Sequence, residues 1–172
     1  MKLWSNAYKN KLIQPEQLID TVKEIRGQGL RGRKEIRIAT LNGSFDLMHA
    51  GHLQIIYEAS LQADILIVAL NSDSSIKAYK STERPIIPLE YRLQLMAALE
   101  FVDYVTWFNE TDPIQLLNDI KPDVHVNGAE YGENCIEADV VKRNGGKLHI
   151  VKLIPGLSTS QILNKITATI GK

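Results

Sequence analysis

The chain has 172 residues, and its 20 basic and 20 acidic side chains give a formal net charge of zero. This length suits one domain with its own core, and the balanced charge argues against a broad surface for nucleic acid or an anionic membrane. One cysteine excludes an internal disulfide, and the absence of a signal peptide or of an apolar run of about 18 residues favours a cytoplasmic protein.

Apolar periodicity predicts strands that alternate with helices along the chain. Strands are expected at 36–41, 64–70, 102–108, 124–126 and 147–153. Helices are expected at 15–25, 52–61, 112–120 and 136–143, in a short segment after Asn71, from Pro88, and after Ser158. Such alternation predicts an α/β fold, a Rossmann-like open parallel sheet with three α/β/α layers. We expect a single domain over residues 1–172, with an N-terminal helical extension at about 1–34.

The turn between the first strand and the next helix is the strongest candidate for chemistry. We predict a turn from Asn42 to Gly51 and a helix that opens at His52. A helix N-terminus presents unpaired N–H groups and a positive dipole end, so it is a ready anion site. Gly43 allows a sharp turn, and Gly51 lets a phosphate approach the backbone. His49 and His52 are three residues apart and are expected to be catalytic donors to a phosphate that gains charge.

A zinc site on His49 and His52 is an alternative interpretation. Structural zinc takes four ligands, usually from Cys and His, and the other candidates are isolated in the sequence: Cys135, His125 and His149. We therefore expect no metal held by the protein alone. Mg²⁺ is expected to be carried by a nucleoside triphosphate, because this ion keeps several waters and takes few protein ligands.

Further polar segments follow other strands, so they should gather at the same edge of the sheet. Lys77 and Lys80 could both face a phosphate from a short helix, and Lys77 is expected to be catalytic. Lys80 and Arg84 are expected to bind the acceptor. Asp46 has two interpretations, an aid to the metal or acceptor and a local bond that holds the turn. Arg92 is expected on a helix surface with a structural partner.

A second helix N-terminus carries three hydroxyls, Ser158, Thr159 and Ser160. They are either a clamp on the β- and γ-phosphates or a simple N-cap.

The segment Gly43-Ser44-Phe45-Asp46-Leu47-Met48-His49-Ala50-Gly51-His52 resembles the signature Gly-x-Phe-Asp-x-x-His-x-Gly-His of the nucleotidyltransferase superfamily. Ser158-Thr159-Ser160 is similar to the Ser-Thr-Thr element of that superfamily, which favours the clamp. The residues then expected to bind the nucleotide and its phosphates are Asn42, Gly43, Ser44, Phe45, Gly51, Asn127, Gly128, Ser158, Thr159 and Ser160.

From about Lys11 to Ile166 the chain resembles, more narrowly, the adenylyltransferases that make nucleotide-activated heptose for bacterial lipopolysaccharide. The similar segments include 68–73, 84–92, 97–103 and 126–131. The resemblance implies an ATP-dependent, Mg²⁺-requiring transfer of AMP to D-glycero-D-manno-heptose 1-phosphate, giving ADP-heptose and pyrophosphate. It also implies a homodimer and, without the sugar kinase fused in many relatives, a stand-alone form.

Two positions depart from the pattern of these adenylyltransferases. Asn127 stands where Lys is common, and Ser81-Thr82 stands where Gly often follows the Lys. Two alternatives also stay open. One is a cytidylyltransferase that uses CTP and glycerol 3-phosphate, and the other is a regulatory module that binds a nucleotide without turnover.

Overall fold

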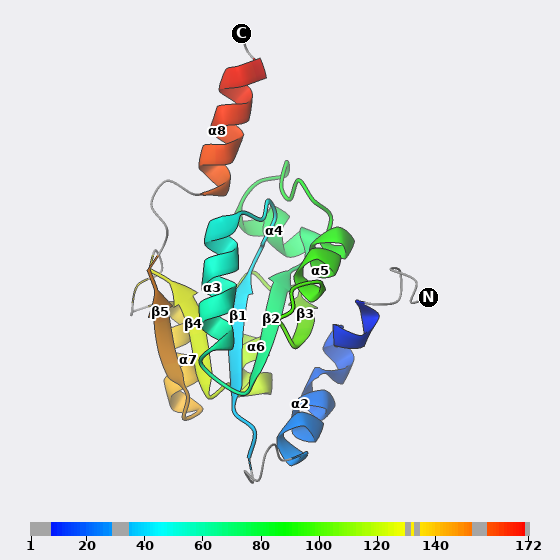
Figure 1. The fold of residues 1–172 in the computed structure, drawn as a ribbon, viewed down its shortest axis with the longest axis vertical. Helices are drawn as coiled ribbons and strands as arrows, with labels where there is room; N and C mark the ends of the chain where they lie inside the picture. Colours follow the sequence, from blue (N-terminus) through cyan, green and yellow to red (C-terminus); the bar gives the residue numbers. More distant parts are fainter. Residues whose placement is uncertain (1–7, 29–34, 130–131, 133–134, 153–157, 171–172) are drawn as a thin grey trace.

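A computed structural model describes residues 8–28, 35–129, 132, 135–152 and 158–170. Its strands form one parallel sheet in the order β3-β2-β1-β4-β5 (Figure 1). Their bounds are Ile38–Gly43 for β1, Ile65–Asn71 for β2, Tyr104–Phe108 for β3, Val124–Gly128 for β4 and Lys147–Val151 for β5. The strand order reverses between β1 and β4, which is the switch point where ligands bind in such folds. The predicted Rossmann-like fold is confirmed.

Helices cover both faces of the sheet (Figure 1). Their bounds are Lys9–Lys11 for η1, Pro15–Gln17 for η2, Leu18–Gly27 for α2, Ala50–Ser60 for α3, Asp73–Tyr79 for α4, Leu89–Ala97 for α5, Ile114–Ile120 for α6, Ile136–Arg143 for α7 and Thr159–Ile170 for α8. Helices α3 and α5 pack on one face, and α2, α6 and α7 lie on the other. Helix α8 extends away from the sheet, and none of its described residues is buried.

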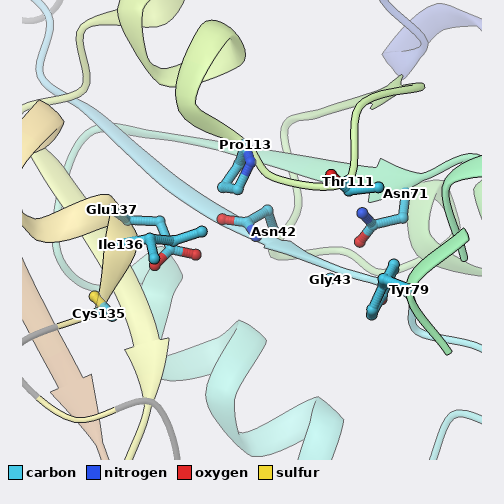
Figure 2. A pocket seen from close by; sticks show the side chains of 9 residues that line it. All are labelled: Asn42, Gly43, Asn71, Tyr79, Thr111, Pro113, Cys135, Ile136 and Glu137. Atoms are coloured by element: carbon cyan, nitrogen blue, oxygen red, sulfur yellow. The ribbon is translucent and has the colours of Figure 1, made fainter.

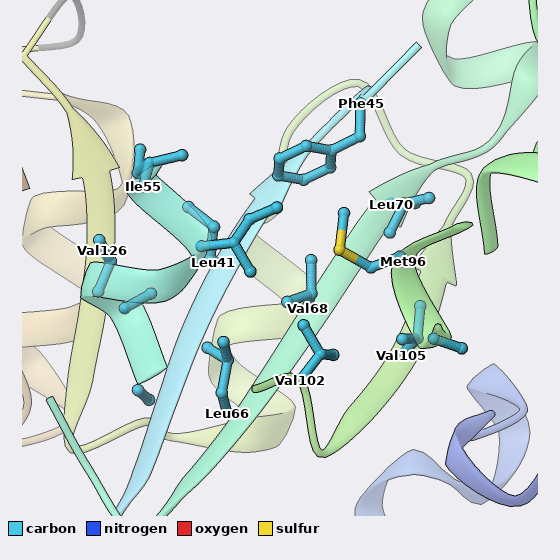
Figure 3. Close-up of a cluster of buried hydrophobic side chains, with 14 of the residues drawn as sticks. Leu41, Phe45, Ile55, Leu66, Val68, Leu70, Met96, Val102, Val105 and Val126 are labelled. Atoms are coloured by element: carbon cyan, nitrogen blue, oxygen red, sulfur yellow. The ribbon is translucent and has the colours of Figure 1, made fainter. Parts of the chain in front are cut away.

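Side-chain alternation along β1 divides the core into two layers. Leu41 points to the α3–α5 side, where it packs near Phe45 and Met96 (Figure 3). Ile38 points to the opposite side, into a cluster that includes Val22 of α2. The N-terminal helix is therefore part of the core. Burial of each such side chain stabilises the fold by about 1.5–3 kcal/mol.

The sequence prediction was wrong about the limits of the first turn. Strand β1 continues through Asn42 and Gly43, because Gly43 still pairs with Leu70 of β2. Helix α3 begins at Ala50, with His49 as its N-cap, and not at His52. The turn is thus shorter than expected, and both histidines lie within a few residues of the start of the helix.

Several other boundaries also differ by one to three residues from the expected ones. Helix α6 begins at Ile114, because the Asp112 carboxylate accepts a hydrogen bond from the Ile114 N–H ahead of the first turn. Strand β4 extends through Asn127 and Gly128, which pair with β5, so it is two residues longer than expected.

Candidate active site

The turn between β1 and α3 is held by a reciprocal cap made of two imidazoles. His49 has an extended backbone, and its Nδ1 accepts a hydrogen bond from the Gly51 N–H at 3.1 Å. The Nδ1 of His52 accepts from the His49 N–H at 3.3 Å. Of the N–H groups at this helix N-terminus, which were expected to be unpaired, that of Gly51 is therefore already bonded to an imidazole.

This cap fixes which ring nitrogen carries the proton. A neutral imidazole whose Nδ1 accepts a hydrogen bond has its proton on Nε2. Burial lowers the pKa of both rings, and that of His52 falls to about 4, helped by the charges of His49 and Lys80. The pair is thus neutral near pH 7, and among the described residues nothing accepts from either Nε2–H. The turn presents two uncharged donors.

Phe45 anchors the turn to the core. Its φ of 45° is in the left-handed region, its side chain is buried, and the edge of its ring meets His52 at 5.5 Å between centroids. A Cβ on Gly43 would lie 3.2 Å from the Phe45 ring. An alanine at position 43 would require the ring to shift by a few tenths of an ångström, so glycine suits this close approach.

Asp46 holds the loop of residues 84–87 against the turn. Its Oδ2 accepts from Arg84 Nε at 2.7 Å and from the Ile86 N–H at 3.0 Å, and its Oδ1 accepts from the Ile87 N–H at 2.8 Å. Burial alone would raise the pKa of Asp46, but the N–H groups of Ile87 and Ile86 and the Arg84 guanidinium outweigh it and lower the pKa. These bonds reach residues 84–87, so the interpretation of Asp46 as the acceptor of a bond within the turn is wrong. Both carboxylate oxygens are occupied.

Arg92 is fully buried, so its predicted place on a helix surface is wrong. Its guanidinium donates to the carbonyl oxygens of Ser44, Asn71 and Ile87 at 2.7, 2.9 and 2.9 Å, and to Asp73 Oδ1 at 2.7 Å. It joins the ends of β1 and β2 to the loop that Asp46 holds. A signal was present in the sequence, because position 92 falls on the apolar face of α5.

Of the two lysines, the structure brings Lys80 to the histidine turn. Its Nζ donates to Ser44 Oγ at 2.9 Å and lies 5.4 Å from the Tyr79 ring centroid. Burial lowers the pKa of Lys80, as does the charge of Arg84, while Asp46 raises it. Lys77 is exposed on α4 and makes no hydrogen bond or ion pair within the described part of the chain. The spacing therefore does not bring both lysines to the turn.

A pocket of about 360 Å³ opens at the carboxyl ends of β1 and β2 (Figure 2). It is lined by Asn42, Gly43, Asn71, Tyr79, Thr111, Pro113, Cys135, Ile136 and Glu137. Asn127 is buried beside it and donates to Cys135 Sγ at 3.3 Å. Burial raises the pKa of the Cys135 thiol, and the Glu137 carboxylate adds to that effect. The sequence did not indicate Glu137 or Thr111, because each is one ordinary polar residue near a helix start.

The predicted phosphate clamp lies at the start of α8. Ser158 Oγ accepts from the Gln161 N–H at 3.2 Å, which is the N-cap geometry. Thr159 and Ser160 follow in the first turn of the helix. The clamp stays a prediction.

Residues 40–169 match the Cytidylyltransferase-like family, and the chain belongs to this family. It is similar to the bifunctional protein HldE of Methylobacillus flagellatus, with 39% identity over 165 residues, 95% of this chain and 33% of the relative. The HldE of Geobacter metallireducens is 38% identical over 149 residues, 86% of this chain and 30% of the relative. The chain thus spans about a third of the length of these curated relatives.

Two solved structures share the fold. The lipopolysaccharide core biosynthesis protein from Thermoplasma volcanium has a TM-score of 0.56 and 26% identity, over 69% of this chain and 97% of its own. The pantoate-beta-alanine ligase from Francisella tularensis has a TM-score of 0.58 over 94% of this chain and 79% of its own, and its 17% identity supports the fold alone. The family and these relatives confirm the predicted class, a nucleotidyltransferase.

Within the described residues, no helix has the length and apolar character needed to cross a membrane. In the same part of the chain, no three His, Cys, Asp or Glu side chains are grouped so that they could hold a metal ion.

Proposed function

We propose that the chain is an adenylyltransferase that transfers AMP from ATP to D-glycero-D-manno-heptose 1-phosphate. The products would be ADP-heptose and pyrophosphate, for the lipopolysaccharide core. The observation that carries the reaction type is the neutral histidine pair at the start of α3. The sugar and the adenine rest on the resemblance described above and on the similarity to HldE and to a lipopolysaccharide core biosynthesis protein. A homodimer in the cytoplasm is part of this proposal.

The proposed reaction is an in-line displacement. An oxygen of the acceptor phosphate attacks the α-phosphorus of ATP, the bond from that phosphorus to the bridging oxygen breaks, and pyrophosphate leaves. Negative charge spreads over the oxygens of the transferring group, so fixed donors that meet this charge lower the barrier. The Nε2–H groups of His49 and His52 are such donors, because the capping bonds already hold both rings in place.

Lys80 is suited to the acceptor phosphate. Its pKa is lowered, and its ammonium has only the Ser44 hydroxyl as a hydrogen-bond acceptor among the described residues. Burial disfavours the charged form of the amine, and an anion beside it would favour that form again. Arg84 is a second cation at the turn, but Asp46 already pairs with it at 2.6 Å.

Mg²⁺ is proposed as the cofactor that accompanies ATP. Both Asp46 oxygens are occupied, so the triphosphate oxygens and waters would hold the ion. When bound, it supplies charge neutralisation at the phosphates. Activity should require added Mg²⁺ and be lost in EDTA. Elemental analysis that finds one tightly held zinc per chain would support the alternative in which His49 and His52 are metal ligands.

A pyrophosphate-release assay tests the substrates directly. ATP and CTP are each combined with D-glycero-D-manno-heptose 1-phosphate, glycerol 3-phosphate and phosphopantetheine. ATP with the heptose 1-phosphate should exceed every other pair by more than about tenfold in kcat/KM, a difference of about 1.4 kcal/mol in transition-state binding.

Each other outcome has a definite meaning. A largest signal from CTP with glycerol 3-phosphate would establish the cytidylyltransferase alternative, and Asn127 would be the first residue to exchange. A different sugar 1-phosphate with ATP would keep the reaction class and reject the heptose. ATP binding without pyrophosphate release from any pair would favour a regulatory module.

A further inference from the structure

The pocket beside the histidine turn contains two buried hydrogen-bond acceptors that lack donors. Glu137 is 5% exposed, and its Oε2 is buried and has no hydrogen-bond partner. The buried Oδ1 of Asn42 also lacks a partner. Both residues line the pocket, and Figure 2 shows their side chains directed toward each other from α7 and β1. Buried polar atoms in folded proteins almost always have partners, so this pair requires an explanation.

The helix that carries Glu137 does not explain its burial. Glu137 lies in the first turn of α7, where the macrodipole favours a carboxylate. Asp139 occupies the same turn and is exposed, so it provides this interaction from solvent. The N-cap, Cys135, makes no side-chain capping bond, and Glu137 has no Lys or Arg partner among the described residues. The carboxylate interacts with the neighbouring Cys135 thiol and raises its pKa, but its Oε2 stays without a partner.

The pocket is polarised along its length. At one end Gly43 and Tyr79 directly precede Ser44 and Lys80, and the Lys80 ammonium donates to Ser44 there. At the other end stands the Glu137 carboxylate. A phosphate suits the first end and is repelled at the second, where two acceptors call for neutral donors such as hydroxyl groups.

We propose that this pocket is the subsite for the hydroxyl-bearing part of the acceptor. Glu137 Oε2 and Asn42 Oδ1 each accept a hydrogen bond from a sugar hydroxyl, while the phosphate of the acceptor points to Lys80. The volume of about 360 Å³ falls in the range of small-ligand sites. The assignment rests on the proposed function for the identity of the acceptor, and it makes Glu137 a determinant of specificity that does not touch the reacting phosphorus.

The test compares two charge-removing changes in one helical turn. Glu137→Gln preserves the side-chain shape and replaces one acceptor oxygen with a donor. Asp139→Asn, the control, removes the same charge from an exposed position. Glu137→Gln should raise KM for the heptose 1-phosphate by about tenfold or more and leave KM for ATP within about twofold. Asp139→Asn should change neither constant. Asn42→Ser is a second variant with the same expected direction.

Calorimetric titration of heptose 1-phosphate separates this subsite from the proposed function. If wild type releases no pyrophosphate but binds the sugar phosphate, and Glu137→Gln weakens binding by about tenfold, the subsite stands and the function fails. If wild type turns over and Glu137→Gln leaves KM for the acceptor unchanged, or raises KM for ATP instead, the subsite is rejected and the function stands. If wild type neither binds the sugar phosphate nor releases pyrophosphate, both are rejected.

Discussion

The imidazoles of His49 and His52 stack with their ring centroids 3.9 Å apart, and each Nδ1 accepts a backbone N–H of the same turn. The stacking and the two hydrogen bonds hold both rings before any ligand arrives. A donor that is already oriented does not have to reorganise when charge develops, which is why such donors stabilise transition states strongly.

The first prediction concerns these two rings. His52→Ala should lower kcat by a hundredfold or more, about 3 kcal/mol, because one oriented donor is lost. The Kd for ATP should change less. His49→Ala removes the N-cap as well, so it should also destabilise the fold by about 1 kcal/mol.

His49→Asn separates the two roles of His49, because Asn is a good N-cap without an imidazole. Its melting temperature should stay close to that of wild type while kcat falls as in His49→Ala. His149→Ala, on the outer strand β5, is the control. Steady-state kinetics and thermal melts of the variants test this, and near-normal turnover in either histidine variant would remove the pair from the mechanism.

The second prediction concerns the bond between Asp46 and Arg84. Asp46 is 1% exposed and accepts four N–H donors, two of them from Arg84, so Asp46→Ala leaves buried groups unpaired. The free energy of unfolding should fall by about 3 kcal/mol. The exposed pair of Asp20 and Lys23 is the comparison, and Asp20→Ala should cost less than about 1 kcal/mol.

The pH dependence has a definite sign. The folded pKa of Asp46 is lowered, so its contribution is complete above the unfolded value of about 3.9 and is lost as the pH falls through the folded value. Urea unfolding at neutral and acidic pH measures both the cost of Asp46→Ala and its dependence on pH. Equal losses of unfolding free energy in Asp46→Ala and Asp20→Ala would show that the bond between Asp46 and Arg84 does not stabilise the loop.

The sequence predicted the parallel sheet well because buried strands and amphipathic helices differ in their period of apolar residues. It also located the histidine turn, since a short motif at a strand–helix junction is a local feature. Helix boundaries near His49 were less accurate, because a cap formed by an imidazole is not among the usual capping signals.

Contacts between distant segments could not be predicted in the same way. The bond from Asp46 to Arg84 joins positions 38 residues apart, and Arg92 reaches back 48 residues to Ser44. Nothing in the local pattern determines such partners. Glu137 shows the same limit, because its position beside Asn42 depends on how α7 meets β1.

The third prediction concerns Arg92, whose four acceptors come from three segments. Lys has a single nitrogen, and it cannot meet acceptors arranged around a planar guanidinium. Arg92→Lys should therefore lower the free energy of unfolding by about 3 kcal/mol and reduce activity, because the Ser44 carbonyl loses its donor. Arg37→Lys, at an exposed position, should change stability by less than about 0.5 kcal/mol. Urea denaturation of both variants measures this difference in stability. Equal midpoints would contradict the role given to Arg92.

The last prediction is an acid sensitivity that originates in the sheet. His125 of β4 is fully buried and lies 2.8 Å from Thr40 Oγ1 through its Nδ1. Burial lowers its pKa to about 4, against a smaller opposing effect of Asn127. Between pH 6.5 and about 4 the unfolded chain binds a proton here that the folded protein does not, so stability falls as the pH falls through this window and levels off below it. The full effect is on the order of 3 kcal/mol.

His52 titrates over the same range because its pKa is also lowered to about 4. The contribution of His125 is therefore measured as the difference between wild type and a His125 variant. His125→Gln keeps a polar side chain that does not titrate. Its unfolding free energy should therefore decline less than that of wild type between pH 7 and pH 4.5. The comparison variant His149→Gln changes a half-buried histidine on the neighbouring strand. Urea denaturation across this range gives the slopes, and parallel curves for wild type and His125→Gln would show that the buried histidine does not determine the acid sensitivity.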